Sequence, residues 1–132
     1  MIKIKRTLYI DRLEELDITN FGVHFTSNMN YSHNGGGSNG LTEEKIIEVD
    51  AYVSEYIVNE EATKISNEEY PNENEVILKQ NQELVVNLRI FGGTMEHGKI
   101  VRYMKDFSNR TIKVNTGNRA DEWVKNLKQK NL

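Results

Sequence analysis

Short stretches of alternating apolar and polar residues constrain the fold of this chain more than any other feature of its sequence. In 21–26, two phenylalanines and a valine share one face of an extended chain, whereas His24 and Thr26 share the other face. At 132 residues the chain has the size of one domain. The pattern therefore predicts a single α+β domain over 1–132. Further stretches with strand-like patterns cover 2–10, 45–53, 75–78, 83–91, 99–104 and 111–114.

Three segments predict helices around these strands. Asp11 is suited to cap a short helix through 12–16, and the acidic segment 60–70 predicts a short helix or a loop before Pro71. Residues 119–128 carry acidic side chains early, basic side chains late and an apolar stripe, which is the pattern of an amphipathic helix. The helices are therefore expected to be short.

Turn-forming residues predict how the strands are connected. The polar residues 79–82 favour a turn that joins 75–78 to 83–91, so these two strands are expected to pair as a hairpin. The glycine pair 92–93 is expected to end the second strand. Residues 28–40 are dominated by Asn, Ser and Gly, which cannot pack a core and indicate a loop.

Composition and charge narrow the classes of function. The chain has no cysteine, which excludes disulfides and thiolate metal sites. Its net charge is -3, and basic residues are scattered among acidic ones without a stripe that could follow a phosphate backbone. No window approaches the roughly 18 apolar residues of a membrane span, and 1–10 alternates instead of forming an apolar signal core. We therefore expect a cytoplasmic protein whose partners include neither nucleic acid nor membrane.

The acidic pair Glu73 and Glu75 is the clearest candidate for chemistry. Residues two apart on an extended chain point to the same face, within reach of one ligand. Two such carboxylates can supply a stabilising anion and a proton acceptor, as chemistry at a sugar carbon through an oxocarbenium-like state requires. The alternative is a solvated strand entrance, and spacing alone favours it because charged residues usually mark solvent.

Three motifs resemble one enzyme family. The sequence Glu-Asn-Glu-Val-Ile-Leu at 73–78 resembles the Glu-x-Glu-Val-Leu-Leu strand of the arginine-type mono-ADP-ribosyltransferases, which include binary toxins and small phage enzymes. Upstream, Phe-Gly-Val-His-Phe-Thr at 21–26 is similar to the Gly-Ile-His-Trp-Thr strand of small bacterial and phage members. Between them, 46–53 is similar to the family's middle strand. The resemblance covers about 8–91, and it rests on the order of short motifs.

This resemblance implies a fold, an activity and roles for residues. The fold is an ADP-ribosyltransferase-like split β-sandwich with short peripheral helices and a cleft between two sheets. The activity is transfer of ADP-ribose from NAD, as substrate, to a protein or other macromolecular acceptor, in a phage context and in the cytoplasm of a bacterial host. Glu75 would bond a nicotinamide-ribose hydroxyl and stabilise the developing positive charge, while Glu73 would orient or activate the acceptor. His24 and Thr26 fall on the strand positions that, in the family, hold the catalytic Glu and the ribose in place.

One family feature is missing from the first strand. Members usually carry Tyr-Arg-Gly there, with an Arg that grips the NAD phosphates, whereas this chain has Tyr-Ile-Asp at 9–11. Arg6 and Arg12 are the candidates to bind the diphosphate instead, although neither occupies the motif position. An acid at Asp11 would repel a diphosphate if it faced the site. The second hypothesis is therefore a non-catalytic binding or inhibitor protein that retains the fold.

Other readings of the candidate residues remain open. A single His on a strand, such as His24, is more often structural than catalytic. His33 and His97 do not share a zinc-binding spacing with His24, so no metal is expected. The glycines at 35–37 lack the spacing of a phosphate-binding loop. A third hypothesis is an unrelated small β-rich structural or assembly protein.

Overall fold

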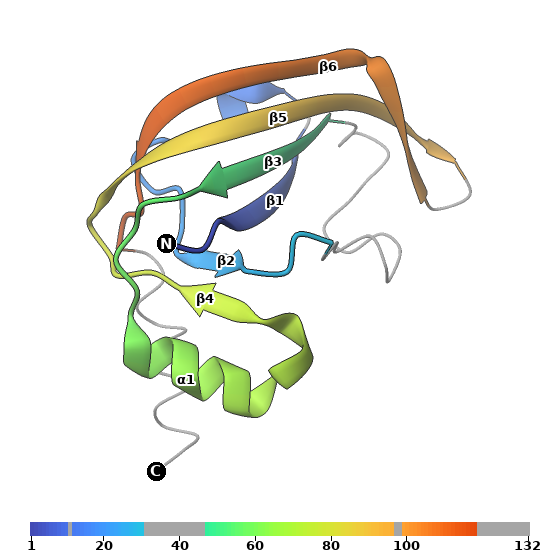
Figure 1. Ribbon diagram of the computed structural model, residues 1–132. Coiled ribbons are helices and arrows are strands. Elements are labelled where there is room, and N and C mark those ends of the chain that lie inside the picture. The colour runs from blue at the N-terminus through green and yellow to red at the C-terminus, as the bar shows by residue number, and fades with distance from the viewer. Residues whose placement is uncertain (11, 31–46, 97–98, 119–132) are drawn as a thin grey trace.

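A computed structural model of the chain describes residues 1–10, 12–30, 47–96 and 99–118 (Figure 1). The strands form one antiparallel sheet in the order β4-β2-β1-β3-β5-β6. Their bounds are β1 (Ile4–Ile10), β2 (His24–Thr26), β3 (Ile47–Val53), β4 (Glu75–Ile77), β5 (Glu83–Glu96) and β6 (Lys99–Asn115).

The predicted α+β class is confirmed as a mostly antiparallel sheet accompanied by helix. The helical elements in the described part of the chain are α1 (Glu60–Glu69) and the 3-10 turns η1 (Leu13–Glu15) and η3 (Pro71–Glu73). The strands are connected in one hydrogen-bonded sheet, whereas the resemblance implied two sheets with a cleft between them. No helix among the described residues has the length and apolar character needed to cross a membrane.

Alternation along the central strands gives the sheet one apolar and one polar face. Leu8 lies opposite Val49, and Val49 lies opposite Ile90, so these residues point to the same side. On the other side, the Thr7 hydroxyl donates to Asp50 Oδ1 at 2.8 Å. The core therefore forms on the first side, from buried residues that include Ile4, Val49, Ala51, Val53, Leu84, Val86 and Leu88.

The predicted hairpin of 75–78 with 83–91 is wrong. β4 pairs with β2 at one edge of the sheet, and β5 pairs with β3 and β6 near the other edge. The predicted turn at 79–82 instead carries the chain across the molecule, where the Asn81 amide donates to the Gly117 carbonyl at 3.1 Å. Alternation makes a residue face the core but does not select the neighbouring strand, so closeness in sequence misled the prediction.

The glycine pair 92–93 does not end β5, which continues to Glu96. The register between β5 and β6 shifts between Ile90 and Gly92, and the pairing then resumes to Glu96 opposite Lys99. Glycine is common at such irregularities because it has no side chain to pack. The two strands predicted at 99–104 and 111–114 are accordingly one long strand, β6, which bends together with β5 in Figure 1.

The predicted helix at 12–16 is the shorter 3-10 turn η1, with Arg12 at its N-cap position and no side-chain cap. The predicted cap, Asp11, lies outside the described residues, as do the predicted helix at 119–128 and most of the predicted loop at 28–40. The segment 60–70 forms α1, and the side chain of Asn59 caps it by accepting from the Ala62 amide at 3.1 Å.

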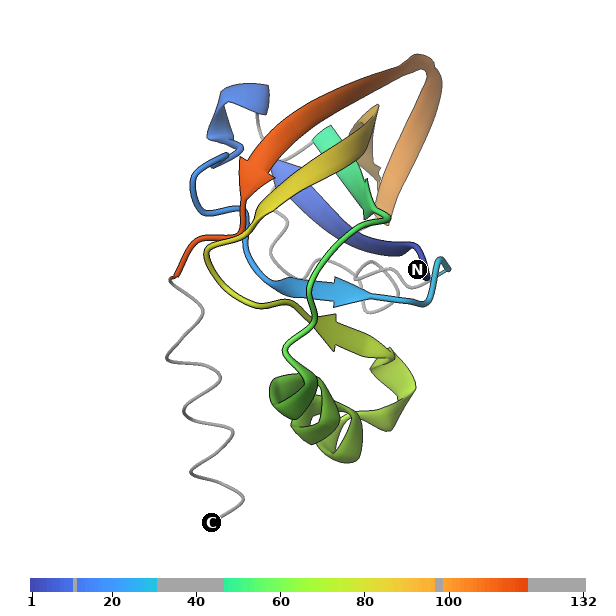
Figure 2. The same ribbon diagram turned by 60° about the vertical axis from the view of Figure 1, so that its left-hand side comes forward.

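Helix α1 covers the outer edge of β4. Figure 2 shows the helix on the side of β4 that faces away from β2. The Thr63 hydroxyl accepts from the Ile77 amide at 2.9 Å and donates to the Ile77 carbonyl at 3.2 Å. Asn67 Nδ2 donates to the Glu75 carbonyl at 3.1 Å. Side chains of the helix therefore take the place of a further strand and fix the position of β4.

Candidate functional site

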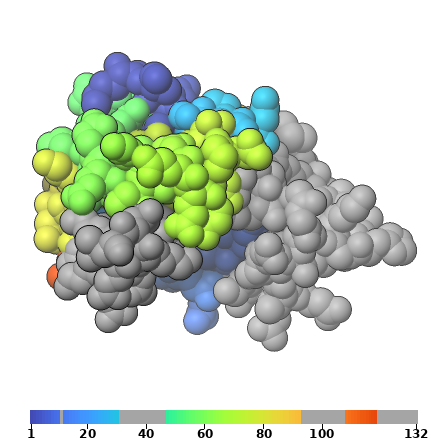
Figure 3. Space-filling view, turned by 90° about the horizontal axis from the view of Figure 1, so that it is seen from below, coloured from blue at the N-terminus to red at the C-terminus, as the bar shows by residue number. Residues whose placement is uncertain are grey.

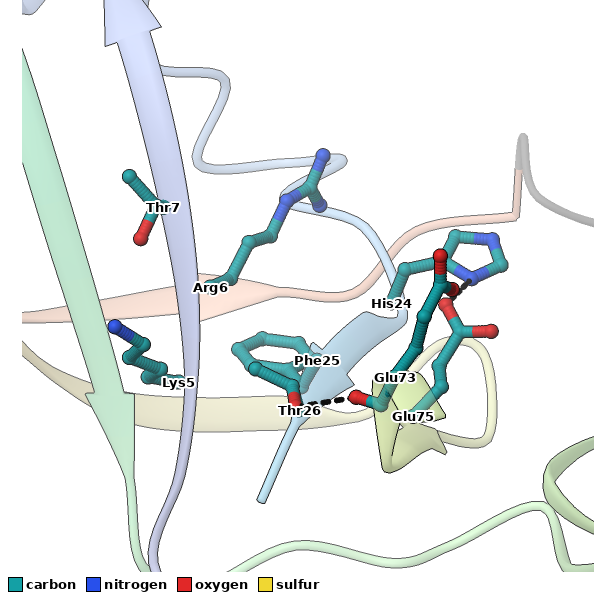
Figure 4. A pocket seen from close by; sticks show the side chains of 8 residues that line it. All are labelled: Lys5, Arg6, Thr7, His24, Phe25, Thr26, Glu73 and Glu75. Carbon is teal, nitrogen blue, oxygen red and sulfur yellow. Dashed lines mark hydrogen bonds and ion pairs between the residues drawn. The ribbon is translucent and has the colours of Figure 1, made fainter. Parts of the chain in front are cut away.

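A pocket lies where β1 and β2 separate. β1 pairs with β3 along its whole length, but it pairs with β2 at Lys5 opposite Thr26. Beyond that pair the two strands diverge, which Figures 1 and 2 both show. The gap between the strands holds a cavity of about 110 Å³ that is partly open to solvent. Its lining comes from β1, β2, η3 and β4: Lys5, Arg6, Thr7, His24, Phe25, Thr26, Glu73 and Glu75 (Figure 4).

The strand register explains why polar side chains gather here. Lys5 lies opposite Thr26, and Thr26 lies opposite Glu75, so the three residues form a row across β1, β2 and β4. Residues opposite one another in an antiparallel sheet point to the same side, and so does His24, two residues before Thr26. The sheet therefore brings His24 and Glu75 within contact of each other.

Both carboxylate oxygens of Glu75 have a hydrogen-bond partner. His24 Nδ1 lies 3.0 Å from Glu75 Oε2, and the Ser66 hydroxyl donates to Glu75 Oε1 at 2.5 Å. The side chains of His24 and Glu75 are 31% and 16% exposed, so this pair is sheltered yet reachable from the pocket. An ionised carboxylate at this distance accepts a hydrogen bond from the protonated Nδ1 of the imidazole.

Thr26 organises the turn that carries Glu73. Its hydroxyl donates to the Glu73 carbonyl at 2.8 Å and accepts from the Asn28 amide at 3.1 Å. The residue is buried, with 7% of its surface exposed. Thr26 therefore holds the backbone of the neighbouring turn in place, although it also lines the pocket.

Glu73 and Glu75 reach the pocket by a route that the spacing argument did not predict. Glu73 ends η3, Asn74 adopts a left-handed conformation with φ of 49°, and Glu75 begins β4. The two residues are therefore not successive same-face positions of one strand. The pocket still contains both, because the turn at Asn74 brings η3 back over the β2 side of β4.

Arg6 reaches into the gap between β1 and β2. Its guanidinium donates to the Phe21 carbonyl and lies 5.9 Å from the centre of the Phe21 ring. Burial lowers the pKa of Arg6 below its ordinary value. Arg12 is exposed and is not among the residues that line this pocket.

Gly22 makes room for that guanidinium. Its φ of +99° is a conformation that other residues rarely adopt, and a Cβ placed on it would lie 1.7 Å from Arg6 Nη1. The glycine of 21–26 therefore has a local function: it lets β2 begin directly against the Arg6 side chain.

Sequence reasoning missed Ser66, Lys5 and Thr7. Ser66 and Ala62 are the buried residues of α1, spaced one turn apart, and this spacing is the signal that could have indicated an inward-facing Ser66. Among the described residues, no group of three or more His, Asp or Glu side chains is arranged to hold a metal ion. His33 and His97 lie outside those residues.

Comparison with protein-family models, with curated proteins and with solved structures found no match to this chain. The chemistry of the site therefore has to be argued from its own side chains. A carboxylate with both oxygens bonded, an imidazole beside it and a guanidinium in the same pocket can together bind a polar ligand and stabilise positive charge that develops on it.

Proposed function

We propose that the protein is a mono-ADP-ribosyltransferase that moves ADP-ribose from NAD to a protein or other macromolecular acceptor. One observation carries this proposal. Five of the six residues that the sequence nominated, Arg6, His24, Thr26, Glu73 and Glu75, line a single pocket although they come from separate parts of the chain. They come from three segments of the chain, and the pairing of β1 with β2 and of β2 with β4 brings these segments together.

The neighbouring positions of the strands also support the proposal, although they form one sheet where the resemblance implied two. The strand with His24 lies between β1 and the strand with Glu75, and the pocket opens where β1 and β2 diverge. A gap inside a sheet gives a ligand access to side chains of several strands at once. The proposal includes a phage-encoded protein that acts in the cytoplasm of a bacterial host.

In this proposal the reaction breaks the bond between the ribose C1′ and the nicotinamide nitrogen. Nicotinamide leaves with the bonding electron pair, and the Glu75 carboxylate stabilises the positive charge that develops on the ribose. The imidazole of His24 forms a hydrogen bond with a ribose hydroxyl. The acceptor then forms the new bond to C1′, and Glu73 takes the proton that the acceptor loses.

A non-catalytic binding or inhibitor protein is the second candidate, and Arg6 is the observation that favours it. The Arg6 guanidinium already donates to the Phe21 carbonyl and stacks near its ring, so part of its hydrogen-bonding capacity is used inside the protein. A guanidinium has five N–H donors, and the remaining ones can bind a diphosphate. Measurement of NAD affinity separates the candidates: a micromolar dissociation constant that is lost in His24→Ala supports the enzyme, and no affinity supports the binding protein.

Transfer itself is tested with labelled NAD and a bacterial lysate. The wild-type protein is expected to label at least one macromolecule, and Glu75→Gln is expected to label none, because it removes the negative charge while keeping the shape of the side chain. Glu68→Gln is the matched control, since Glu68 is exposed on α1 and lies outside the pocket lining. Equal labelling by wild type and Glu75→Gln would overturn the assigned role.

A further inference from the structure

We propose that Ser66, on helix α1, is a positioning residue for Glu75. This inference rests on the proposed function for its effect on catalysis. Its structural content, a coupling from Ser66 through Glu75 to His24, can be measured without any activity.

The carboxylate of Glu75 is held from two directions. Ser66 on α1 donates to Oε1, while His24 on β2 contacts Oε2 (Figure 4 shows the His24 contact). The last torsion of a Glu side chain has a broad energy profile, so each hydrogen bond to the carboxylate restricts its rotation further. Two partners at opposite oxygens fix its plane and direct the Oε2 side toward the pocket.

Ser66 differs from the other polar residues on its face of α1. Thr63 and Asn67 bond the backbone of β4, whereas Ser66 bonds a side-chain carboxylate in the pocket. Ser66 is fully buried, with 0% of its surface exposed. A buried hydroxyl that donates to an ionised group makes one of the stronger kinds of protein hydrogen bond.

The helix can transmit this constraint because its own position is fixed. Asn59 caps its first turn, and Thr63 and Asn67 attach it to the backbone of Ile77 and Glu75. In the view from below, α1 and η3 lie on the surface beside the end of β2 (Figure 3). A rigid helix that carries the second partner is a preorganised support for a functional side chain.

The first test compares Ser66→Ala with Thr63→Val by steady-state cleavage of NAD. Ser66→Ala is expected to lower kcat by about 10-fold to 100-fold, because small displacements of a reacting group are costly, with KM for NAD changed less than about twofold. Thr63→Val removes a hydroxyl one turn away that bonds backbone, and is expected to lower thermal stability at least as much while it lowers kcat less than about threefold. Equal losses of kcat in the two variants, or no loss in Ser66→Ala, would overturn the proposal.

The second test needs no turnover. The ring nitrogen signals of His24, assigned by their absence in His24→Gln, are recorded by ¹⁵N NMR in the wild-type protein, Ser66→Ala and Thr63→Val. The Nδ1 signal is expected to shift in Ser66→Ala alone, because Glu75 loses its second partner and reorients. A shift without any NAD cleavage would support the coupling and contradict the proposed function. An unchanged signal in a folded Ser66→Ala would contradict the coupling itself.

Discussion

At the scale of single residues, the side chain of Glu75 is mostly shielded from solvent and has defined hydrogen-bond contacts. Its side chain is 16% exposed, and each carboxylate oxygen has its own partner, so the charge faces few water molecules and has little freedom to turn. An anion in such a setting stabilises nearby positive charge more strongly than an anion in bulk water does. The pocket therefore suits a reaction in which positive charge develops on the ligand.

Gly22 provides a residue-scale prediction. Gly22→Ala is expected to lower the free energy of unfolding by about 1–3 kcal/mol and to weaken NAD binding, because a left-handed backbone and the Arg6 guanidinium both oppose a Cβ there. Urea denaturation and titration with NAD measure the two effects. In an Arg6→Ala background the same substitution is expected to cost less, since the collision is removed. An equal loss of unfolding free energy in both backgrounds would show that the Arg6 guanidinium is not the reason why residue 22 is glycine.

Sequence was a good guide to residues that belong to short motifs and a poor guide to contacts between elements. His24 and Thr26 alternate with apolar residues, and this local pattern was sufficient to place them on one side of β2. Ser66 contacts Glu75 only because α1 docks against β4, and no pattern within either segment encodes that docking. Glu73 and Glu75 both line one pocket, but they are not the same-face positions of one strand that their spacing predicted.

At the scale of elements, α1 and β4 behave as one unit. β4 is a short edge strand, and its outer backbone groups are satisfied by side chains of the helix. The sequence of 60–70 did not distinguish a helix from a loop, because its apolar residues have little regular spacing. The cap at Asn59 and the inward-facing Ala62 favour the helix over the loop. Both become evident only once the helix has a surface to pack against.

Loss of the cap is expected to loosen this unit. Asn59→Ala should lower the free energy of unfolding by about 1 kcal/mol, because the Ala62 amide loses its side-chain acceptor. Hydrogen exchange should also become faster at amides of α1 and at the Ile77 amide, which Thr63 protects. Asn59→Asp keeps an acceptor at the cap and serves as the control. Unchanged exchange at Ile77 in the Ala variant would contradict the coupling of α1 to β4.

At the scale of the whole molecule, the sheet curls until its ends approach. β6 is the last strand in the sheet order, yet the Phe21 amide, just before β2, donates to the Asn115 carbonyl at 2.8 Å at the end of β6. The Gly22 amide likewise donates to the Thr116 carbonyl at 3.0 Å. The segment that leads into the site is thus held by the far strand. Pairings of this kind join distant parts of the chain, and sequence patterns alone do not specify them.

Ligand binding should stabilise the entire fold. NAD at about 100 times its dissociation constant is expected to raise the free energy of unfolding by about 2.7 kcal/mol, which corresponds to a rise of several degrees in Tm. Arg6→Gln removes the guanidinium from the pocket and should reduce this shift at the same NAD concentration. Differential scanning calorimetry measures both. An equal shift in the two proteins would exclude Arg6 as a diphosphate ligand.

Release of nicotinamide from NAD by the purified protein tests the central claim most directly. The wild-type protein is expected to release nicotinamide in a single-exponential or steady-state reaction, and Glu75→Gln is expected to be slower by about 100-fold or more, because the neutral amide does not stabilise a developing cation. Circular dichroism should show that the variant remains folded. Release at the same rate by wild type and Glu75→Gln, or no release by the wild-type protein, would contradict the assignment of Glu75 as the catalytic carboxylate.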